Sequence, residues 1–95
     1  MSETYNGYAN YETWVCKLWI DNDDNYYKEV TLQAYEENEG NRNLTIDCIK
    51  NCIELELEEN MPEVEGVYLD LLNSAIGNID TWELAEILYN DYIEE

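Results

Sequence analysis

The sequence contains no histidine, no phenylalanine, one proline and only four lysine or arginine residues among its 95 residues. Without histidine, neither a Ser-His nor a Cys-His nucleophile pair can form, and no glycine-rich phosphate loop is present. Carboxylate pairs are so abundant in this chain that two neighbouring acids do not indicate acid–base catalysis. We therefore expect a protein that is not an enzyme and that uses no cofactor.

Long apolar runs are also absent. No segment approaches the roughly 18 apolar residues that a membrane span requires, and the N-terminus lacks the basic and apolar regions of a secretion signal. The three cysteines, Cys16, Cys48 and Cys52, have no framework spacing and fall within helical patterns. Free thiols of this kind are typical of a reducing compartment, so we expect a soluble, cytoplasmic protein.

Two clusters of potential metal ligands lack residues that a metal site of their type requires. The run Asp21–Asn25 offers oxygens at positions 1, 3 and 5 of a calcium loop, but Tyr26 stands where that loop needs glycine and Leu32 where it needs a bidentate glutamate. Cys48 and Cys52 lie four residues apart on a predicted helix, and without histidine a zinc site would need a carboxylate or water to complete it. Small buried cysteines are the better interpretation. We expect no metal site.

Apolar residues are plentiful enough for one folded core. They make up 45 % of the chain, and nine tyrosines and three tryptophans replace phenylalanine in aromatic packing. A chain of this length forms one domain. We therefore expect a single domain over residues 1–95, in which the polar residues 1–9 form a surface arm.

Hydrophobic periodicity predicts an all-α, compact fold of four to five short helices. The predicted helices span about residues 10–22, 25–38, 43–58, 67–75 and 80–93. Asn10 and Asp80 are expected to cap the first and last helices, and Asn43 or Thr45 the third. The alternating run at 53–58 is also compatible with a strand, but a helix is favoured because no second such run exists to pair with it.

The first helix organises the predicted core. Its residues Tyr11, Trp14, Val15, Leu18 and Trp19 follow helical spacing and form one apolar stripe, which we expect to face the interior. The third helix carries apolar residues on two sides, so we expect it to be packed on two sides. The predicted core residues are Trp14, Leu18, Ile49, Ile53, Leu71, Leu72, Trp82 and Leu88.

The two ends of the chain resemble each other. The segments Asn10–Trp14 and Asn78–Trp82 share the pattern Asn-x-acid-Thr-Trp, and Asn followed by Asp comes eight residues after each tryptophan. An internal duplication would produce this pattern. Similar helix-start chemistry at two unrelated helices would produce it as well, and we favour that interpretation.

Negative charge is the most unusual property of the chain, because 23 aspartates and glutamates leave a net charge of −19. Such a surface disfavours nucleic acid and anionic membranes, and favours basic proteins, cations or the positively charged grooves that normally hold nucleic acid. Duplex DNA carries one charge per about 1.7 Å, so this net charge matches roughly 32 Å of duplex. A solvated acidic face that maintains solubility is the alternative.

Two signatures resemble those of a family of small acidic proteins found in phages, plasmids and bacterial genomes. One is Asn-Tyr-Glu-Thr-Trp at Asn10–Trp14, followed by Leu-Trp-Ile-Asp-Asn at Leu18–Asn22. The other is Tyr-x-Asp-Leu-Leu-Asn-x-Ala-Ile/Leu followed by a run of the type Asn-x-x-Trp-Glu-Leu/Ile-Ala-Glu, and it is matched by Tyr68–Ile76 and Asn78–Glu86. The chain departs from it by the inserted Thr81 before Trp82, and the middle of the chain, Glu36–Glu65, diverges. The resemblance covers most of the domain and implies an origin in a mobile element.

Mobile-element origin and strong acidity together predict an anti-defence protein. We expect it to mimic DNA and to occupy the cationic groove of a host CRISPR effector or restriction nuclease, without binding nucleic acid or membrane itself. The carboxylates expected to form the mimic surface are Asp21, Asp23, Asp24, Glu36, Glu37, Asp47, Glu54, Glu56, Glu58, Glu59, Glu83 and Glu86. An acidic adaptor or chaperone-like binder of a basic mobile-element protein is the alternative, and exposed tyrosines leave homodimer formation open.

Overall fold

The computed structural model describes residues 7–94 apart from the side chain of Asp24, and all regular structure in this range is helical. The all-α, single-domain prediction is confirmed. Residues 53–58 are helical, so the alternating run is not a strand. The helices are α1 (Tyr11–Asn22), α2 (Asp24–Glu37), α3 (Arg42–Glu59), α4 (Val67–Gly77) and α5 (Thr81–Tyr92).

Side-chain caps begin three of these helices. Asn10, Asn41 and Asp80 each accept a hydrogen bond from the backbone N–H three residues later, which satisfies one of the unpaired donors of the first turn. The caps of α1 and α5 are those predicted. The prediction of Asn43 or Thr45 for α3 is wrong, because the helix begins one residue after Asn41 and both residues lie inside its first turn.

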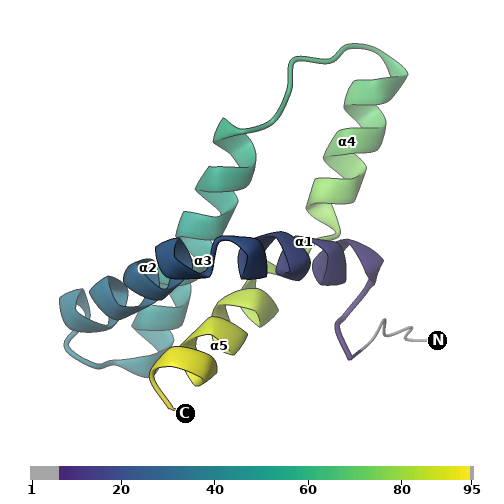
Figure 1. Cartoon of the computed structure of the whole chain (residues 1–95). Coiled ribbons are helices and arrows are strands. Elements are labelled where there is room, and N and C mark those ends of the chain that lie inside the picture. The colour runs from purple at the N-terminus through teal and green to yellow at the C-terminus, as the bar shows by residue number, and fades with distance from the viewer. Residues whose placement is uncertain (1–6, 95) are drawn as a thin grey trace.

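Helix α3 is the central element of the fold. It packs mainly against α5 and, as an antiparallel hairpin, against α2, while α1 crosses this group (Figure 1). Helix α4 stands apart at the other end of the molecule, beside the C-terminal half of α3, and is joined to it by residues 60–66 (Figure 1). The fold therefore consists of a packed group of four helices, α1, α2, α3 and α5, from which helix α4 projects.

The core lies between α3, α5 and α2. Ile46, Ile49 and Ile53 form one face of α3 and have almost no exposed surface, as do Leu84 and Leu88 on α5. Ala34 and Thr31 on α2, Ile20 and Cys16 on α1, and Ala85 and Tyr89 on α5 are buried with them. Burial of these side chains supplies the main driving force of folding.

Several predicted core residues lie outside this core. Ile49, Ile53 and Leu88 are buried as predicted, but Trp14 and Leu72 are only half-buried. Leu18, Leu71 and Trp82 are exposed, with 61 % of Leu71 and 38 % of Trp82 accessible to solvent.

The predicted orientation of α1 is also wrong. The helix turns Thr13, Cys16 and Ile20 inward, whereas 71 % of Trp19 is exposed. Because apolar residues cover more than half of the circumference of α1, the pattern permits two inward faces, and the packing partner selects between them.

The second apolar face of α3 is not packed as expected. Leu44 and Leu55 are exposed, and Cys48 and Cys52 are half-buried. Helices α2 and α5 both lie against the isoleucine side of α3, so no helix remains to cover the opposite face.

A network of hydrogen bonds joins the start of α1 to the start of α5. The fully buried Thr13 hydroxyl donates to Asn10 Oδ1 (2.7 Å) and accepts from the backbone N–H of Asp80 (2.8 Å). The N–H of Ala9 donates to Glu83 Oε1 (2.9 Å), and the Asn10 amide donates to the carbonyl of Asn78. This junction fixes α1 across the end of α5. Of the predicted arm, residues 1–6 lie outside the described part of the chain, and Ala9 is held by α5.

The junction also bears on the similarity between the two ends of the chain. In the shared pattern Asn10 aligns with Asn78, but the residue that caps α5 is Asp80, two positions later. Thr13 therefore lies at the third position of α1, whereas Thr81 is the first residue of α5. The two segments are not equivalent helix starts in the register of the sequence pattern, so the choice between duplication and shared helix-start chemistry stays a prediction.

We expect core and surface leucine-sized residues to differ sharply in their effect on stability. Ile49→Ala should lower the free energy of unfolding by about 2 to 5 kcal/mol, because it leaves a cavity between α3 and its neighbours. Leu71→Ala should change it by less than about 0.5 kcal/mol, since most of Leu71 is already in water. Urea unfolding followed by circular dichroism measures both, and equal effects would contradict the described core.

We also expect the junction to depend on the Thr13 hydroxyl. Thr13→Val keeps the shape of the side chain but leaves the N–H of Asp80 without its acceptor, so it should cost about 1 to 3 kcal/mol. Thr31→Val is the matched control: Thr31 is equally buried, but its hydroxyl donates only to the Tyr27 carbonyl of its own helix (2.7 Å). In thermal unfolding, the midpoint temperature of Thr13→Val should be clearly lower than that of Thr31→Val.

Candidate functional site

The predicted mimic carboxylates fall into two groups in the structure. The first group lies on exposed positions of the α2–α3 hairpin and its ends. It comprises Asp21, Asp23, Glu36, Glu37, Asp47, Glu58 and Glu59, together with Asp24, whose side chain lies outside the described part. Apart from Asp24, these residues are exposed, and one of them, Asp21 at the end of α1, is paired with Lys17.

The second group contacts other parts of the protein. Glu54 accepts from the Thr81 hydroxyl (2.7 Å), and Glu83 accepts from the N–H of Ala9. Glu86 pairs with Arg42 (3.0 Å), and Glu56 accepts from the Tyr26 hydroxyl (3.1 Å). These four carboxylates connect helices or loops, and their role as mimic surface stays a prediction.

The bond between Glu54 and Thr81 has an electrostatic consequence. The Thr81 hydroxyl, with help from Lys50, holds the pKa of Glu54 below its ordinary value. Because the folded-state pKa is depressed, Glu54 favours the folded state above the pH at which the unfolded carboxyl titrates, and this contribution is lost as the pH falls. The exposed position of Glu54 keeps the contribution small.

The four cations do not form a positive surface. Lys17 pairs with Asp21, Lys50 with Glu54 (3.4 Å) and Arg42 with Glu86. The Arg42 guanidinium also lies over the Tyr89 ring, 5.4 Å from its centroid. Positive charge is therefore masked by neighbouring carboxylates at three of the four sites.

The α2–α3 hairpin carries acidic residues along its whole length. Residues 23–59 contain eleven carboxylates and three cations, a net charge of −8. Helix α3 has 18 residues and so extends about 27 Å at 1.5 Å per residue. One strand of DNA carries about eight phosphates over that length at 3.4 Å per nucleotide. The net charge per length of the hairpin is thus similar to that of a single DNA strand.

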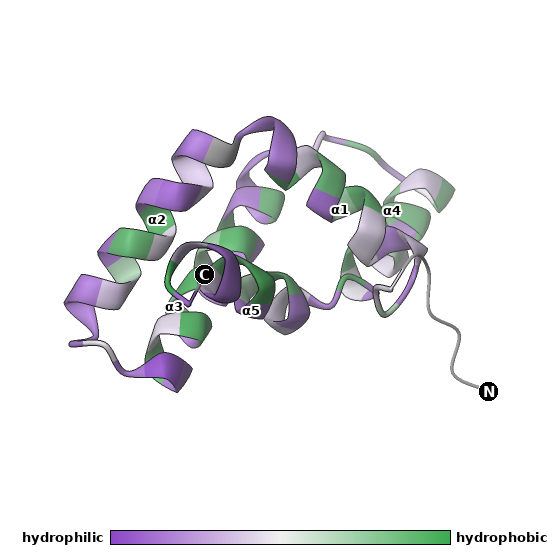
Figure 2. Ribbon diagram, turned by 60° about the horizontal axis from the view of Figure 1, so that its bottom comes forward, coloured by the Kyte–Doolittle hydropathy of each residue, from purple (hydrophilic) through white to green (hydrophobic). Residues whose placement is uncertain are grey.

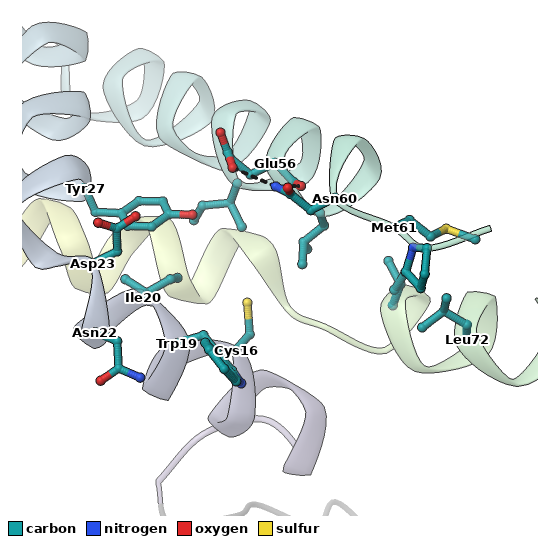
Figure 3. A pocket seen from close by; sticks show the side chains of 14 residues that line it. Cys16, Trp19, Ile20, Asn22, Asp23, Tyr27, Glu56, Asn60, Met61 and Leu72 are labelled. Atoms are coloured by element: carbon teal, nitrogen blue, oxygen red, sulfur yellow. Dashed lines mark hydrogen bonds between the residues drawn. The ribbon is translucent and has the colours of Figure 1, made fainter. Parts of the chain in front are cut away.

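A second candidate surface, which the sequence analysis did not predict, is an apolar groove between α1, the C-terminal half of α3 and α4. It consists of two adjoining hollows of about 570 and 410 Å³, whose walls share Cys16, Trp19, Leu57, Leu72 and Ile76. Figure 2 shows hydrophobic residues along the neighbouring helices α1 and α4. Figure 3 shows Trp19 and Cys16 on one side of the first hollow and Leu72 on the other.

The groove exists because α4 has no close packing partner. None of its residues is buried, although it is the most apolar helix of the chain, and 70 % of Tyr68 is exposed. The misassigned residues of α1 lie here: Val15 and Trp19 line the groove rather than the core. Two features of the sequence could have indicated the groove: helix α1 is apolar on two sides, and helix α4 is strongly apolar.

The chemistry of the groove is that of a binding surface. Burial raises the pKa of the Cys16 thiol from its ordinary value of 9.0 to about 11, so the thiol is protonated and a weak nucleophile at neutral pH. Burial, reinforced by Glu56, raises the pKa of Tyr27 to about 12. Neither group is activated for catalysis.

Two further properties concern the described residues as a whole. Within residues 7–94, no group of three or more cysteine, aspartate or glutamate side chains is arranged to hold a metal ion. None of the helices in that range combines the length and the apolar character that crossing a membrane requires.

Comparison with known proteins identifies a family. A family profile matches the whole chain, residues 1–95. The protein belongs to DUF7249, a family of unknown function. No match was found among curated proteins or among solved structures. Functional inference for this DUF7249 member therefore depends on its acidic hairpin and its apolar groove.

We expect the buried thiol of this DUF7249 member to make the fold sensitive to alkali. Because the folded-state pKa of Cys16 is raised, its contribution to stability is complete below pH 9 and is lost as the pH rises toward about 11. Cys16→Ala removes this titration. The urea concentration at the unfolding midpoint should therefore fall more between pH 8 and pH 10.5 for the wild type than for Cys16→Ala. Equal declines would show that the titration of Cys16 does not contribute to the loss of stability.

Proposed function

We propose that this protein is an anti-defence inhibitor that mimics DNA. It occupies the cationic nucleic-acid groove of a host CRISPR effector or restriction nuclease, in the cytoplasm of the host cell, and has no catalytic activity of its own. The observation that carries the proposal is the net charge of −19, with a strand-like charge density along the α2–α3 hairpin.

The dimensions of the molecule support this proposal. Its longest extent is 44 Å, enough to replace the roughly 32 Å of duplex that would carry the same charge. The hairpin is made of two helices that pack against a common core, so the backbone sites that carry its exposed carboxylates hold fixed positions. Fixed positions reduce the entropy that is lost when a charged groove closes around them.

The mechanism would be electrostatic. A cationic groove attracts the hairpin by the same long-range field that attracts DNA, so the association rate should fall as salt screens the charges beyond a Debye length of about 8 Å. Masking of Lys17, Lys50 and Arg42 by neighbouring carboxylates removes positive charge that would repel such a groove.

The runner-up function, an acidic adaptor or chaperone-like binder of a basic mobile-element protein, would use the same charge on a different target. The two proposals differ in one measurable respect. An inhibitor of the mimic type competes with DNA for its target, whereas an adaptor captures a protein encoded by the mobile element and is indifferent to nuclease.

We expect DNA to displace the protein from its target. The tagged full chain is used to capture host proteins from a lysate cleared of nucleic acid, with and without a saturating 20-base-pair duplex. The captured nuclease or effector should be lost when duplex is present, and its cleavage of DNA should be inhibited by the pure chain. A captured protein that stays bound under saturating duplex would refute mimicry.

Charge reversal on the hairpin supplies the matched variants. Asp47→Lys combined with Glu58→Lys should weaken the complex several-fold or more, because both residues are exposed on α3. Glu65→Lys combined with Asp70→Lys changes the net charge by the same amount away from the hairpin and should have a much smaller effect. Glu54 is not a suitable site for this test, since its bond to Thr81 joins α3 to α5.

A further inference from the structure

The groove between α1, α3 and α4 has an apolar floor and a polar rim of one sign. Its two hollows are lined by 19 different residues, most of them apolar. The charged members are Glu12, Asp23 and Glu56, and no lysine or arginine is among them. Trp19, the most exposed large side chain of the groove, stands at its edge.

We propose that this groove binds an amphipathic helix of another protein, with an apolar stripe that is flanked by lysine or arginine. The apolar stripe would cover Trp19, Leu72 and Ile76, and the basic flanks would pair with the carboxylates of the rim. Burial of the apolar stripe supplies affinity, and the rim selects the charge of the partner.

A helix fits this site better than an extended peptide. Extended peptides commonly bind by adding a strand to an exposed sheet edge, and residues 7–94 form no sheet. The walls of the groove are mostly helical, with Met61 and Pro62 of the α3–α4 connection beside them, and its two hollows adjoin through a shared set of apolar residues. An apolar channel between helices is the usual receptor for the apolar face of a further helix.

Charge argues against a second copy of this chain as the occupant. Each copy carries a net charge of −19. The most exposed apolar helix, α4, would bring its own Asp70 and the neighbouring Glu63 and Glu65 toward the rim residues Glu12, Asp23 and Glu56. Like charges brought together in a partly dry interface oppose association, whereas a basic helix turns the same rim into an attraction.

The groove shares Asp23 and Glu56 with the predicted mimic carboxylates, but Asp47 and Glu58, the positions that test mimicry, line neither hollow, so the inference does not depend on DNA mimicry. The groove is tested directly with designed peptides, and DNA competition is not part of the test. The two proposals can therefore fail separately.

The experiment uses three synthetic peptides of 18 residues and the full-length protein. The first peptide places leucine at helical spacing i, i+3, i+4 and i+7 and lysine at the flanking positions. The second replaces every lysine with glutamate. The third has the composition of the first, but its order is scrambled so that no apolar stripe remains. Isothermal titration calorimetry gives the dissociation constants, and the difference in tryptophan fluorescence between the wild type and Trp19→Ala separates the signal of Trp19 from those of Trp14 and Trp82.

The first peptide should bind at least tenfold more tightly than either of the others. Trp19→Ala should weaken this binding at least tenfold, while Leu32→Ala should leave it within twofold. Leu32 is an exposed leucine on α2 that lines neither hollow, so it controls for the loss of any exposed apolar side chain. Trp19 is largely exposed, and circular dichroism should show that its removal leaves the helices intact.

Three outcomes would overturn the proposal. Equal binding of the scrambled lysine peptide would mean that the protein attracts positive charge without using the groove. Equal binding to Trp19→Ala would place the contact on another surface. Sedimentation equilibrium that finds the free protein as a dimer, which Trp19→Ala dissociates, would assign the groove to a second copy of the chain.

Discussion

A single row of side chains, Ile46, Ile49 and Ile53, determines how the rest of the protein is arranged. These isoleucines lie on one face of α3, and α5 and α2 both pack against that side. The three helices α2, α3 and α5 bury these isoleucines between them, and this burial is the strongest hydrophobic contribution to the fold. The arrangement leaves the opposite face of α3, one side of α1 and all of α4 without a complete partner.

The distribution of charge follows from the same arrangement. Carboxylates are kept off the isoleucine row, so most of them extend into water, where a high dielectric weakens their mutual repulsion. A few are fixed by donors that the fold supplies, such as the Thr81 hydroxyl for Glu54 and the backbone N–H of Ala9 for Glu83. These bonds let a strongly acidic chain use some of its carboxylates as connections between helices.

The two candidate surfaces have different physical origins but favour the same kind of partner. The hairpin offers rigid, exposed negative charge, which acts at long range and is screened by salt. The groove offers apolar area beside three carboxylates, which acts only on contact. Both proposals therefore name a positively charged protein as the partner. The hairpin suits a broad cationic groove, and the apolar groove suits a single basic helix.

The sequence by itself determined the helices, the caps of α1 and α5, and the charge. Local signals decide these features: apolar periodicity within one helix, Asn10 and Asp80 at helix starts, and the excess of acids over bases. The middle of the core was also predictable, because Ile49, Ile53 and Leu88 lie on the dominant apolar faces of their helices. The predicted acidic positions Asp47 and Glu58 are exposed for the same local reason, since they lie on the polar side of α3.

Only the tertiary structure decided which face of α1 points inward and which large side chains remain outside. Trp19 and Leu71 have the composition of core residues, yet they are exposed, because burial depends on whether another element lies opposite and not on the side chain alone. The same holds for Glu54, whose bond to Thr81 depends on how α3 meets α5. The groove could not be predicted from the sequence for this reason: it is formed by the position of α4 relative to α1 and α3, which no local pattern specifies.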